Sequence, residues 1–289
     1  MATDITECIS CGSRDFQSYS QELIRCQNCS LVAASQIPSA GEIEQLYQEE
    51  YFFGMEYFDY KADRQALEQN FKRRMRRMNF LLDPQFKVAE IGCAYGYFLN
   101  LIKDNVGDHV GFDVSREGID YAIKELQVKA TTEDFLTYQI APNSIDSMFM
   151  WDVIEHLANP DDYMRKIGEC LKPGGHVALT TGNIEAWLAR KRGTEWRMIH
   201  PPTHVYYFSP ATLDLLFKKY GLRTVSVKHK SVSRNAGSVL NQLISNRKAS
   251  HKNSAHLAAA HKLADLTRAN KLNISLNLFD IMEVVAIKD

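Results

Sequence analysis

The sequence lacks both a strong excess of charge and a long apolar run. Its 34 Lys and Arg residues are balanced by 35 Asp and Glu residues, so the net charge of -1 gives no general attraction toward nucleic acid or anionic membranes. No run of about 18 consecutive apolar residues occurs, and no membrane-spanning helix is predicted. The first residues, Met1 to Asp4, have neither the basic start nor the apolar stretch of a signal peptide, and we expect a cytoplasmic protein.

Cysteine is scarce beyond the first thirty residues, with only two of the six there. The other four lie within the first thirty residues and form two C-x-x-C pairs. These are Cys8 with Cys11 and Cys26 with Cys29. Two thiolates three positions apart on a tight turn hold two corners of a tetrahedron, and a second pair supplies the other two. The spacing predicts a structural zinc site with no open coordination position. Two disulfides are the alternative, which a cytoplasmic chain disfavours.

Composition and pattern together suggest three parts. Hydrophobic residues make up 45% and charged residues 24%, which excludes a disordered or fibrous class. We predict a zinc-ribbon-like module at 1–37, an aromatic connector and leading helix at 38–82, and an α/β domain at 83–289. A helical insertion is expected at about 229–278, because a structureless loop of that length is improbable inside a compact domain.

The leading helix is predicted from about Lys61 to Leu82, where apolar residues recur every three or four positions, and Asp83-Pro84 ends it. Its opposite face carries five basic residues: Lys72, Arg73, Arg74, Arg76 and Arg77. This face either attracts phosphate or is simply solvated. We favour the solvated face, because no aromatic or glycine pattern for nucleic acid accompanies it.

After Pro84 short apolar runs alternate with helical patterns. Strands are predicted at 88–91, 110–112, 128–130, 145–150, 177–181, 222–227 and 281–287, and helices at 97–102, 116–126, 161–171 and 210–220. Strand, helix, strand repeated in this way implies parallel pairing, because each crossover returns the chain to the same end of the sheet. The predicted fold class is therefore α/β, a doubly wound and mostly parallel seven-stranded sheet.

A glycine-containing turn follows the first strand of this sheet. Gly92, Ala94 and Gly96 give the pattern G-x-A-x-G, with Glu90 before it, and let the backbone pass close to a ligand at the carboxyl end of the strand. The pattern differs from the G-x-G-x-x-G of dinucleotide-binding turns. Asp113, at the end of the second strand, lies where it can accept hydrogen bonds from both hydroxyls of an adenosine ribose.

Several motifs then follow in order: the E-x-G-x-A-x-G turn, the acidic end of the second strand, an E-H-L segment and an L-K-P-G-G turn. In this order the sequence closely resembles the class I methyltransferases that depend on S-adenosylmethionine, from roughly Phe71 to Val227. The alternative is a set of ordinary strand-end turns. The resemblance implies these cofactor-binding residues: Glu90, Gly92, Cys93, Ala94 and Gly96 around the methionine part, Asp113 at the ribose with Val114 next to it in the chain, Asp134 and Phe135 at the adenine, and Trp151 and Asp152 near the sulfonium.

The zinc knuckles, Tyr51-Phe52 in the connector and the H-V-Y-Y-F-S segment at 204–209 resemble a bacterial group that acts on small molecules. That group includes sugar-nucleotide C-methyltransferases and relatives of the ubiquinone O-methyltransferases. The resemblance implies methyl transfer to a sugar or sugar nucleotide of a surface-polysaccharide or secondary-metabolite pathway. A quinone or lipid acceptor is the alternative; an RNA or protein methyltransferase and a non-catalytic scaffold that binds adenosylmethionine also stay open, although the near-neutral charge disfavours nucleic acid.

Methyl transfer needs a positioned acceptor and a group that removes its proton. Candidate bases are His156 with Glu155, and His200 or His204; we favour His204, because the neighbouring Tyr206 and Tyr207 would offer hydroxyls to a polar acceptor. Each of these histidines could instead be a packed residue. The segment from Trp187 to Trp196, with the basic residues Arg190, Lys191, Arg192 and Arg197, either closes over an anionic acceptor such as a nucleotide diphosphate or is solvated.

Overall fold

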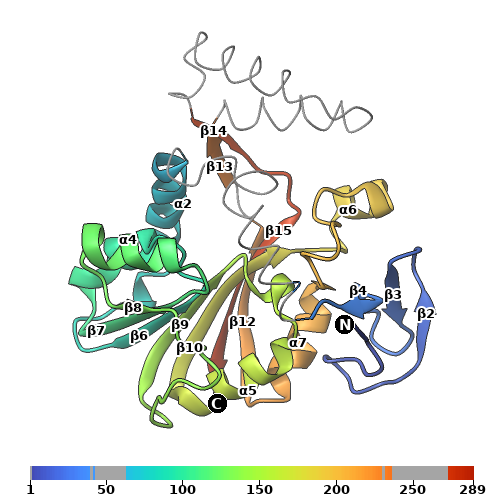
Figure 1. Cartoon of the computed structure of the whole chain (residues 1–289), viewed down its shortest axis with the longest axis horizontal. Coiled ribbons are helices and arrows are strands. Elements are labelled where there is room, and N and C mark those ends of the chain that lie inside the picture. The colour runs from blue at the N-terminus through green and yellow to red at the C-terminus, as the bar shows by residue number, and fades with distance from the viewer. Residues whose placement is uncertain (1, 40–41, 43–62, 230–231, 236–272) are drawn as a thin grey trace. The chain divides into compact units, whose positions relative to one another are not determined.

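The structure is a computed structural model that describes residues 2–39, 42, 63–229, 232–235 and 273–289 (Figure 1). It contains two compact units. The first unit comprises Met1–Glu44, Met78–Lys230 and Leu278–Asp289, and the second comprises Gln45–Arg77 and Ser231–Asn277. Most of the predicted connector, including Tyr51-Phe52, and the predicted helices between 236 and 272 lie outside the described residues.

A seven-stranded sheet forms the centre of the first unit, with the strand order β12-β15-β10-β9-β6-β7-β8. The strands are β6 (Lys87–Ile91), β7 (Asp108–Phe112), β8 (Ala130–Thr131), β9 (Ile145–Trp151), β10 (Leu171–Gly182), β12 (Leu222–His229) and β15 (Ile281–Lys288). Strands β6 to β10 pair in parallel, and β15 runs antiparallel to both β10 and β12. The predicted doubly wound, mostly parallel sheet of seven strands is confirmed.

The helices of this unit are α3 (Tyr97–Ile102), α4 (Arg116–Leu126), α5 (Pro160–Cys170), α6 (Trp187–Arg192) and α7 (Pro210–Lys218). The predictions for α3 and α4 agree with the structure to the residue. A local signal explains the start of α4, because the Ser115 hydroxyl accepts a hydrogen bond from the Gly118 amide and caps the helix. Ser209 and Thr212 form a capping box at the start of α7.

Strand β10 begins earlier than expected. The Lys-Pro-Gly-Gly turn, predicted to lie between helix and strand, is part of β10, with an irregularity in the pairing with β9 between Leu171 and His176. Gly174 adopts a positive φ of 78° there, which lets the strand bend without ending.

The cysteine module belongs to the same unit. Its strands are β1 (Thr3–Asp4), β2 (Phe16–Ser18), β3 (Leu23–Cys26), β4 (Val32–Ala34) and β5 (Gln36–Ile37). A four-stranded sheet has the order β11-β4-β3-β2, and its outer strand β11 (Tyr206–Tyr207) comes from the α/β part of the chain. One cluster of buried residues runs from Leu23 and Cys26 into the core around β9 and β10. The module therefore shares its core with the large sheet.

The second unit contains α2 (Arg64–Arg77) and the antiparallel pair β13 (Val232–Asn235) and β14 (Asn273–Leu276). The prediction that the leading helix continues to Leu82 is wrong, because Met78 leaves the helical region with φ -119° and ψ 26° and a short 3₁₀ turn, η1 (Asn79–Leu81), follows. Arg74, predicted on a solvated face, is buried, and its guanidinium lies 5.5 Å from the centre of the Phe71 ring. The described ends of the predicted helical insertion are strands. No helix within the described ranges is long and apolar enough to cross a membrane.

Candidate active site

The turn after β6 has a backbone that glycine makes possible. Gly92, Ala94 and Gly96 all have positive φ, at 74°, 46° and 70°. A Cβ on Gly92 would lie 2.3 Å from Cγ2 of Val153, the residue that follows the end of β9 by two positions. Only glycine fits at this point, since a side chain would meet both an unfavourable φ and a filled space. The turn is thus packed directly against the segment that follows β9.

Asp113 joins this turn to the end of β7. Its Oδ2 accepts a hydrogen bond from the Ala94 amide at 2.8 Å, and its Oδ1 accepts one from the Ser115 amide at 2.8 Å. Burial raises the pKa of the Asp113 carboxyl, and these two amides oppose the shift. Each carboxylate oxygen has a second lone pair, so Asp113 can hold the strained Ala94 in place and still accept a hydroxyl of a ligand.

The other residues predicted at the cofactor lie near the same edge. Glu90 and Cys93 are buried, and burial raises the pKa of the Cys93 thiol well above its ordinary value, helped by the charges of Asp113 and Glu90. Val114 is 74% exposed, an apolar side chain beside the turn that a ligand could cover. Trp151 ends β9 and packs against Phe98, with ring centres 5.2 Å apart.

The remaining residues predicted at the cofactor, Asp152, Asp134 and Phe135, differ in how accessible their side chains are to a ligand. The Asp152 amide donates to the Thr180 carbonyl at 3.1 Å, and Asp152 itself has a positive φ of 55°. The Asp134 carboxylate is exposed and accepts a hydrogen bond from the Leu136 amide at 2.9 Å. The Phe135 ring is buried, 5.4 Å from the Phe112 ring centre. Its ring is therefore part of the core, and Asp134 is the more accessible of this pair.

Glu155, His156 and His204 form one buried cluster, in which the ligand atoms of the three side chains lie within 4.8 Å of one another. Glu155 and His156 belong to the 3₁₀ turn η3 (Ile154–His156), which follows β9. The rings of His156 and His204 are 4.4 Å apart and nearly perpendicular. His200, the fourth candidate base, has its ring centre 3.7 Å from that of His204. The structure thus brings together all the predicted acid and base residues.

Backbone carbonyls orient two of these rings. His156 Nδ1 lies 2.9 Å from the Thr203 carbonyl oxygen, and His204 Nδ1 lies 2.7 Å from the Met198 carbonyl oxygen. A carbonyl only accepts, so in each ring Nδ1 carries the proton and Nε2 is the nitrogen that can receive one. Sequence reasoning missed Thr203 and Met198, because their contribution comes from main-chain atoms that no side-chain pattern reveals.

Tyr206 and Tyr207 are not available to an acceptor, and the prediction that they would supply hydroxyls to it is wrong. Both side chains are buried. The Tyr207 hydroxyl donates to the His204 carbonyl at 2.9 Å, and the Tyr206 hydroxyl donates to the Ala158 carbonyl at 3.4 Å. Their backbones pair with β4, so the two tyrosines belong to the small four-stranded sheet.

The predicted basic segment divides into two parts. Arg197 forms an ion pair with the buried Asp280 at 2.9 Å, and the Trp196 indole donates to the same carboxylate at 2.9 Å. Arg197 is therefore committed to the fold. Arg190, Lys191 and Arg192 are exposed on α6. Lys191 Nζ lies 4.8 Å from the centre of the Trp187 ring, and this tryptophan is 72% exposed.

The four N-terminal cysteines lie within 4.8 Å of one another at their sulfur atoms. The Cys8 and Cys29 sulfurs are 3.4 Å apart, and those of Cys11 and Cys26 are 3.6 Å apart. These distances are too long for disulfides. A tetrahedral zinc with Zn–S bonds of about 2.3 Å places its sulfurs about 3.8 Å apart, so the four thiols fit such an ion. The Cys29 thiol and burial raise the pKa of Cys8, a cost that a bound cation would relieve.

Comparison with known proteins shows which family the chain is similar to. A family model described as a methyltransferase domain matches residues 58–227, more than half of the chain. The chain is 33% identical over 104 residues to phosphoethanolamine N-methyltransferase 2 of Caenorhabditis elegans, a match over 34% of this chain and 24% of that one. It is 27% identical over 155 residues to the ubiquinone biosynthesis O-methyltransferase of Cupriavidus pinatubonensis, over 49% and 62%.

In both cases the match spans less than two thirds of the relative. Among solved structures, a SAM-dependent methyltransferase from Archaeoglobus fulgidus superposes with a TM-score of 0.52 and 18% identity, over 84% of this chain and 99% of that one. At this level of identity the likeness concerns the fold.

Proposed function

This chain belongs to the family of the methyltransferase domain, and we propose that it transfers a methyl group from S-adenosylmethionine to a small-molecule acceptor. The turn from Gly92 to Gly96 and the Asp113 carboxylate would hold the cofactor. Their chemistry fits it: an exposed apolar flank at Val114, backbone in the left-handed region close to the sheet edge, and a carboxylate that can accept from ribose hydroxyls.

The observation that carries this proposal is the contact between the cofactor turn and the segment that contains the acid and base. Gly92 touches Val153, and Glu155 and His156 follow two and three residues later. In this proposal, cofactor binding and proton removal would fall to neighbouring segments at the carboxyl end of the parallel strands.

When bound, the cofactor supplies a methyl group that its positive sulfur already activates, so the chain has to position the acceptor and accept its proton. His204 is the proposed base, and because its side chain is only 1% exposed, the acceptor would have to enter the buried cluster to reach it. Its Nδ1 is held by the Met198 carbonyl, which leaves Nε2 as the basic nitrogen. The Glu155 carboxylate, in the same buried cluster, would stabilise the positive charge that the imidazole acquires. His156 would complete the cluster and limit the movement of the His204 ring.

A sugar or sugar nucleotide is the acceptor class that we propose. The exposed basic residues of α6 support a diphosphate group there: Arg190, Lys191 and Arg192. The exposed Trp187 on the same helix offers a flat surface on which a base could stack. A buried acid and histidine cluster suits an acceptor whose hydroxyl, or whose carbon next to a carbonyl, must lose a proton.

A second acceptor class, a phenolic hydroxyl of a quinone precursor, is favoured by the name of the relative from Cupriavidus pinatubonensis. Its proton could be removed by the same cluster. The two classes differ in charge, because a sugar nucleotide carries a diphosphate and a simple catechol does not. The α6 cations should therefore matter for the first class only.

The test compares the two acceptors with radiolabelled adenosylmethionine. We expect turnover with a nucleoside-diphosphate sugar, and we expect the triple variant R190Q/K191Q/R192Q to raise its KM by about tenfold, since each lost charge-assisted contact costs about 1 kcal/mol or less at an exposed site. Turnover of catechol alone, unaffected by the triple variant, would replace the sugar with the phenolic acceptor. Turnover with neither acceptor, despite tight cofactor binding, would refute both classes.

A further inference from the structure

The cysteine module is joined to the candidate catalytic residues by backbone hydrogen bonds. Strand β11 pairs with β4 so that Tyr206 lies opposite Ala33 and Tyr207 opposite Val32. The Ala34 amide donates to the Val205 carbonyl at 2.7 Å. On its other side the Val205 amide donates to the Glu155 carbonyl at 2.8 Å. Val205 therefore connects the module to Glu155 and directly follows His204 in the chain.

The second cysteine pair lies in the turn that leads from β3 into β4. Cys26 is the last residue of β3, and Cys29 precedes β4 by three residues. The Cys26 amide donates to the Leu31 carbonyl at 2.8 Å, and the Ser30 amide donates to the Cys26 carbonyl at 2.9 Å. This turn is the second metal-binding knuckle, so an ion held by the cysteines would hold the start of β4 as well.

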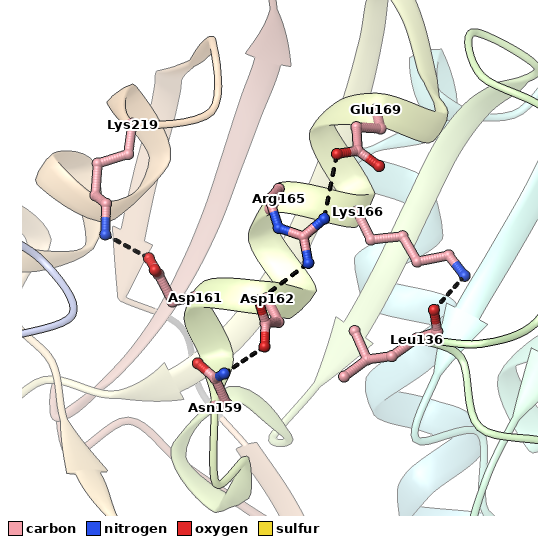
Figure 2. Close-up of polar contacts among 8 residues, drawn as sticks. All are labelled: Leu136, Asn159, Asp161, Asp162, Arg165, Lys166, Glu169 and Lys219. Atoms are coloured by element: carbon pink, nitrogen blue, oxygen red, sulfur yellow. Dashed lines mark hydrogen bonds and ion pairs between the residues drawn. The ribbon is translucent and has the colours of Figure 1, made fainter. Parts of the chain in front are cut away.

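The first cysteine pair is fastened to the α/β part from another direction. Lys219 Nζ donates to the carbonyl of Ile9, between Cys8 and Cys11, at 2.9 Å, and to Asp161 Oδ1 at 2.6 Å. Figure 2 shows Lys219 reaching Asp161 at the beginning of α5. Besides the shared core, hydrogen bonds thus join the module to the α/β part at β11 and at Lys219.

The cofactor turn is held differently. The amides of Gly92 and Cys93 donate to the Phe112 carbonyl, at 2.8 and 3.1 Å, and Asp113 binds the Ala94 amide. These bonds join β6 and β7, and they involve no residue of the module. Loss of order in the module would therefore affect Val205 and its neighbours first.

We propose that the four-cysteine module is the positioning element of the catalytic cluster: zinc bound by the cysteines keeps β4 in place, β4 holds β11, and β11 fixes His204 beside Glu155. This proposal rests on the proposed function for its catalytic consequence. Removal of zinc lowers kcat, while the affinity for adenosylmethionine stays the same. The strands of the module are only two to four residues long, so an ion that holds the turns between them is expected to matter for their order.

The experiment uses the full chain and hydrogen exchange. Zinc is removed with a chelator, and Cys26→Ser provides the genetic counterpart. Amide exchange in 199–208 should accelerate by about tenfold or more, whereas exchange in 87–113 and the calorimetric Kd for adenosylmethionine should change by less than about twofold. Zinc added back to the chelated chain should restore protection. Cobalt in place of zinc should give the absorption of a thiolate complex, which reports occupancy without any turnover.

Cys170→Ala is the matched control, because Cys170 is a buried cysteine of α5 that lies outside the four-cysteine group. It should leave exchange in 199–208 unchanged. Equal protection of 199–208 with and without zinc would overturn the proposal. Parallel loss of protection in 87–113 and of cofactor affinity would overturn it too, since the metal would then stabilise the whole fold. If the wild type does not bind adenosylmethionine, the proposed function fails. The exchange comparison still decides whether the cysteine module positions the segment around His204.

A pair of variants keeps the proposal testable if Cys26→Ser does not fold. Tyr207→Phe removes the hydroxyl that donates to the His204 carbonyl, and Tyr206→Phe removes the one that donates more weakly to Ala158. All four cysteines remain. We expect Tyr207→Phe to lower kcat by about threefold to tenfold with the KM for cofactor unchanged, and Tyr206→Phe to have less than about half of that effect. Equal effects of the two variants would contradict the role of β11 in placing His204.

Discussion

The two sides of the candidate active site are assembled in different ways. The centre of the cofactor side comes from two adjacent strands, β6 and β7, and one carboxylate, Asp113, connects their ends through a hydrogen bond from the Ala94 amide. The acceptor side combines η3 after β9, the segment around His204 and the cysteine module. The first is a local structure, and the second depends on contacts between distant parts of the chain.

This difference has a functional consequence. Cofactor binding should survive changes that disturb the acceptor side, because the Gly92 to Gly96 turn is held within β6 and β7. Proton removal should be sensitive to many positions, since the His204 ring depends on Met198, Val205 and β4. The variants below separate these two behaviours.

His204→Ala should have the largest effect. Loss of a general base lowers kcat by about a hundredfold to a thousandfold, whereas the Kd for adenosylmethionine should stay within about twofold. Single-turnover kinetics and calorimetry measure the two quantities. His200→Ala is the control, because its ring lies beside His204 but outside the Glu155 cluster, and a smaller loss is expected. If His200→Ala proved the more damaging, the base would have to be reassigned.

Gly92→Ala tests the contact that joins the two sides. A Cβ would meet Val153 Cγ2 at 2.3 Å in addition to the cost of positive φ. We expect a loss of about 2 to 4 kcal/mol in the free energy of unfolding. Gly174→Ala is the matched control, since Gly174 has a similar φ of 78° but a Cβ added there would have no atom within 4 Å. Only about 1 kcal/mol of the free energy of unfolding should therefore be lost. Denaturant titration gives both values, and equal losses would mean that the Val153 contact does not matter.

Asp113→Ala should weaken cofactor binding rather than catalysis. It removes the acceptor for the Ala94 and Ser115 amides and the proposed partner of the ribose, so the Kd for adenosylmethionine should rise by about thirtyfold. The kcat at saturating cofactor should fall much less. Asp120→Ala, an exposed aspartate on α4, is the control and should leave the Kd unchanged. An unaltered Kd in Asp113→Ala would remove Asp113 from the cofactor site.

The pH dependence of cofactor binding should give the smallest of these effects, about tenfold over the acid range. Burial raises the pKa of Asp113, so on acidification this carboxyl takes up its proton at a higher pH than an ordinary aspartate does. The protonated form accepts hydrogen bonds poorly, and affinity should therefore fall as the pH drops through this raised pKa. Asp113→Asn should bind with an affinity that depends little on pH; a slope equal to that of the wild type would assign the titration to another group.

Most of the fold could be predicted from the sequence because its signals are local. The Ser115 cap marks the start of α4, and the strands β6, β7 and β9 are short apolar runs between helices. Where tertiary packing competes with pattern, prediction failed. Arg74 lies on the charged face of a helical pattern and is nevertheless buried, and α2 ends five residues before Leu82. The Lys-Pro-Gly-Gly turn reads as a break and is part of β10.

The cofactor side of the site could be predicted from the sequence more fully than the acceptor side. The spacing of Gly92, Gly96 and Asp113 indicates a nucleoside-binding edge, and in the structure the Ala94 amide joins the 92–96 turn to Asp113. Glu155, His156 and His204 could be named as candidates, but their meeting could not be foreseen, because it depends on β11 crossing to β4. The two tyrosines carry no sequence pattern that predicts their pairing with a strand of the cysteine module.

Calorimetric titration with S-adenosylmethionine and, separately, with NAD tests the central claim most directly. The account predicts one adenosylmethionine bound per chain with micromolar affinity or better, no heat from NAD, and the same cofactor affinity in His204→Ala as in the wild type. Heat from NAD alone, or no heat from adenosylmethionine, would contradict it, and so would a cofactor affinity that disappears together with His204.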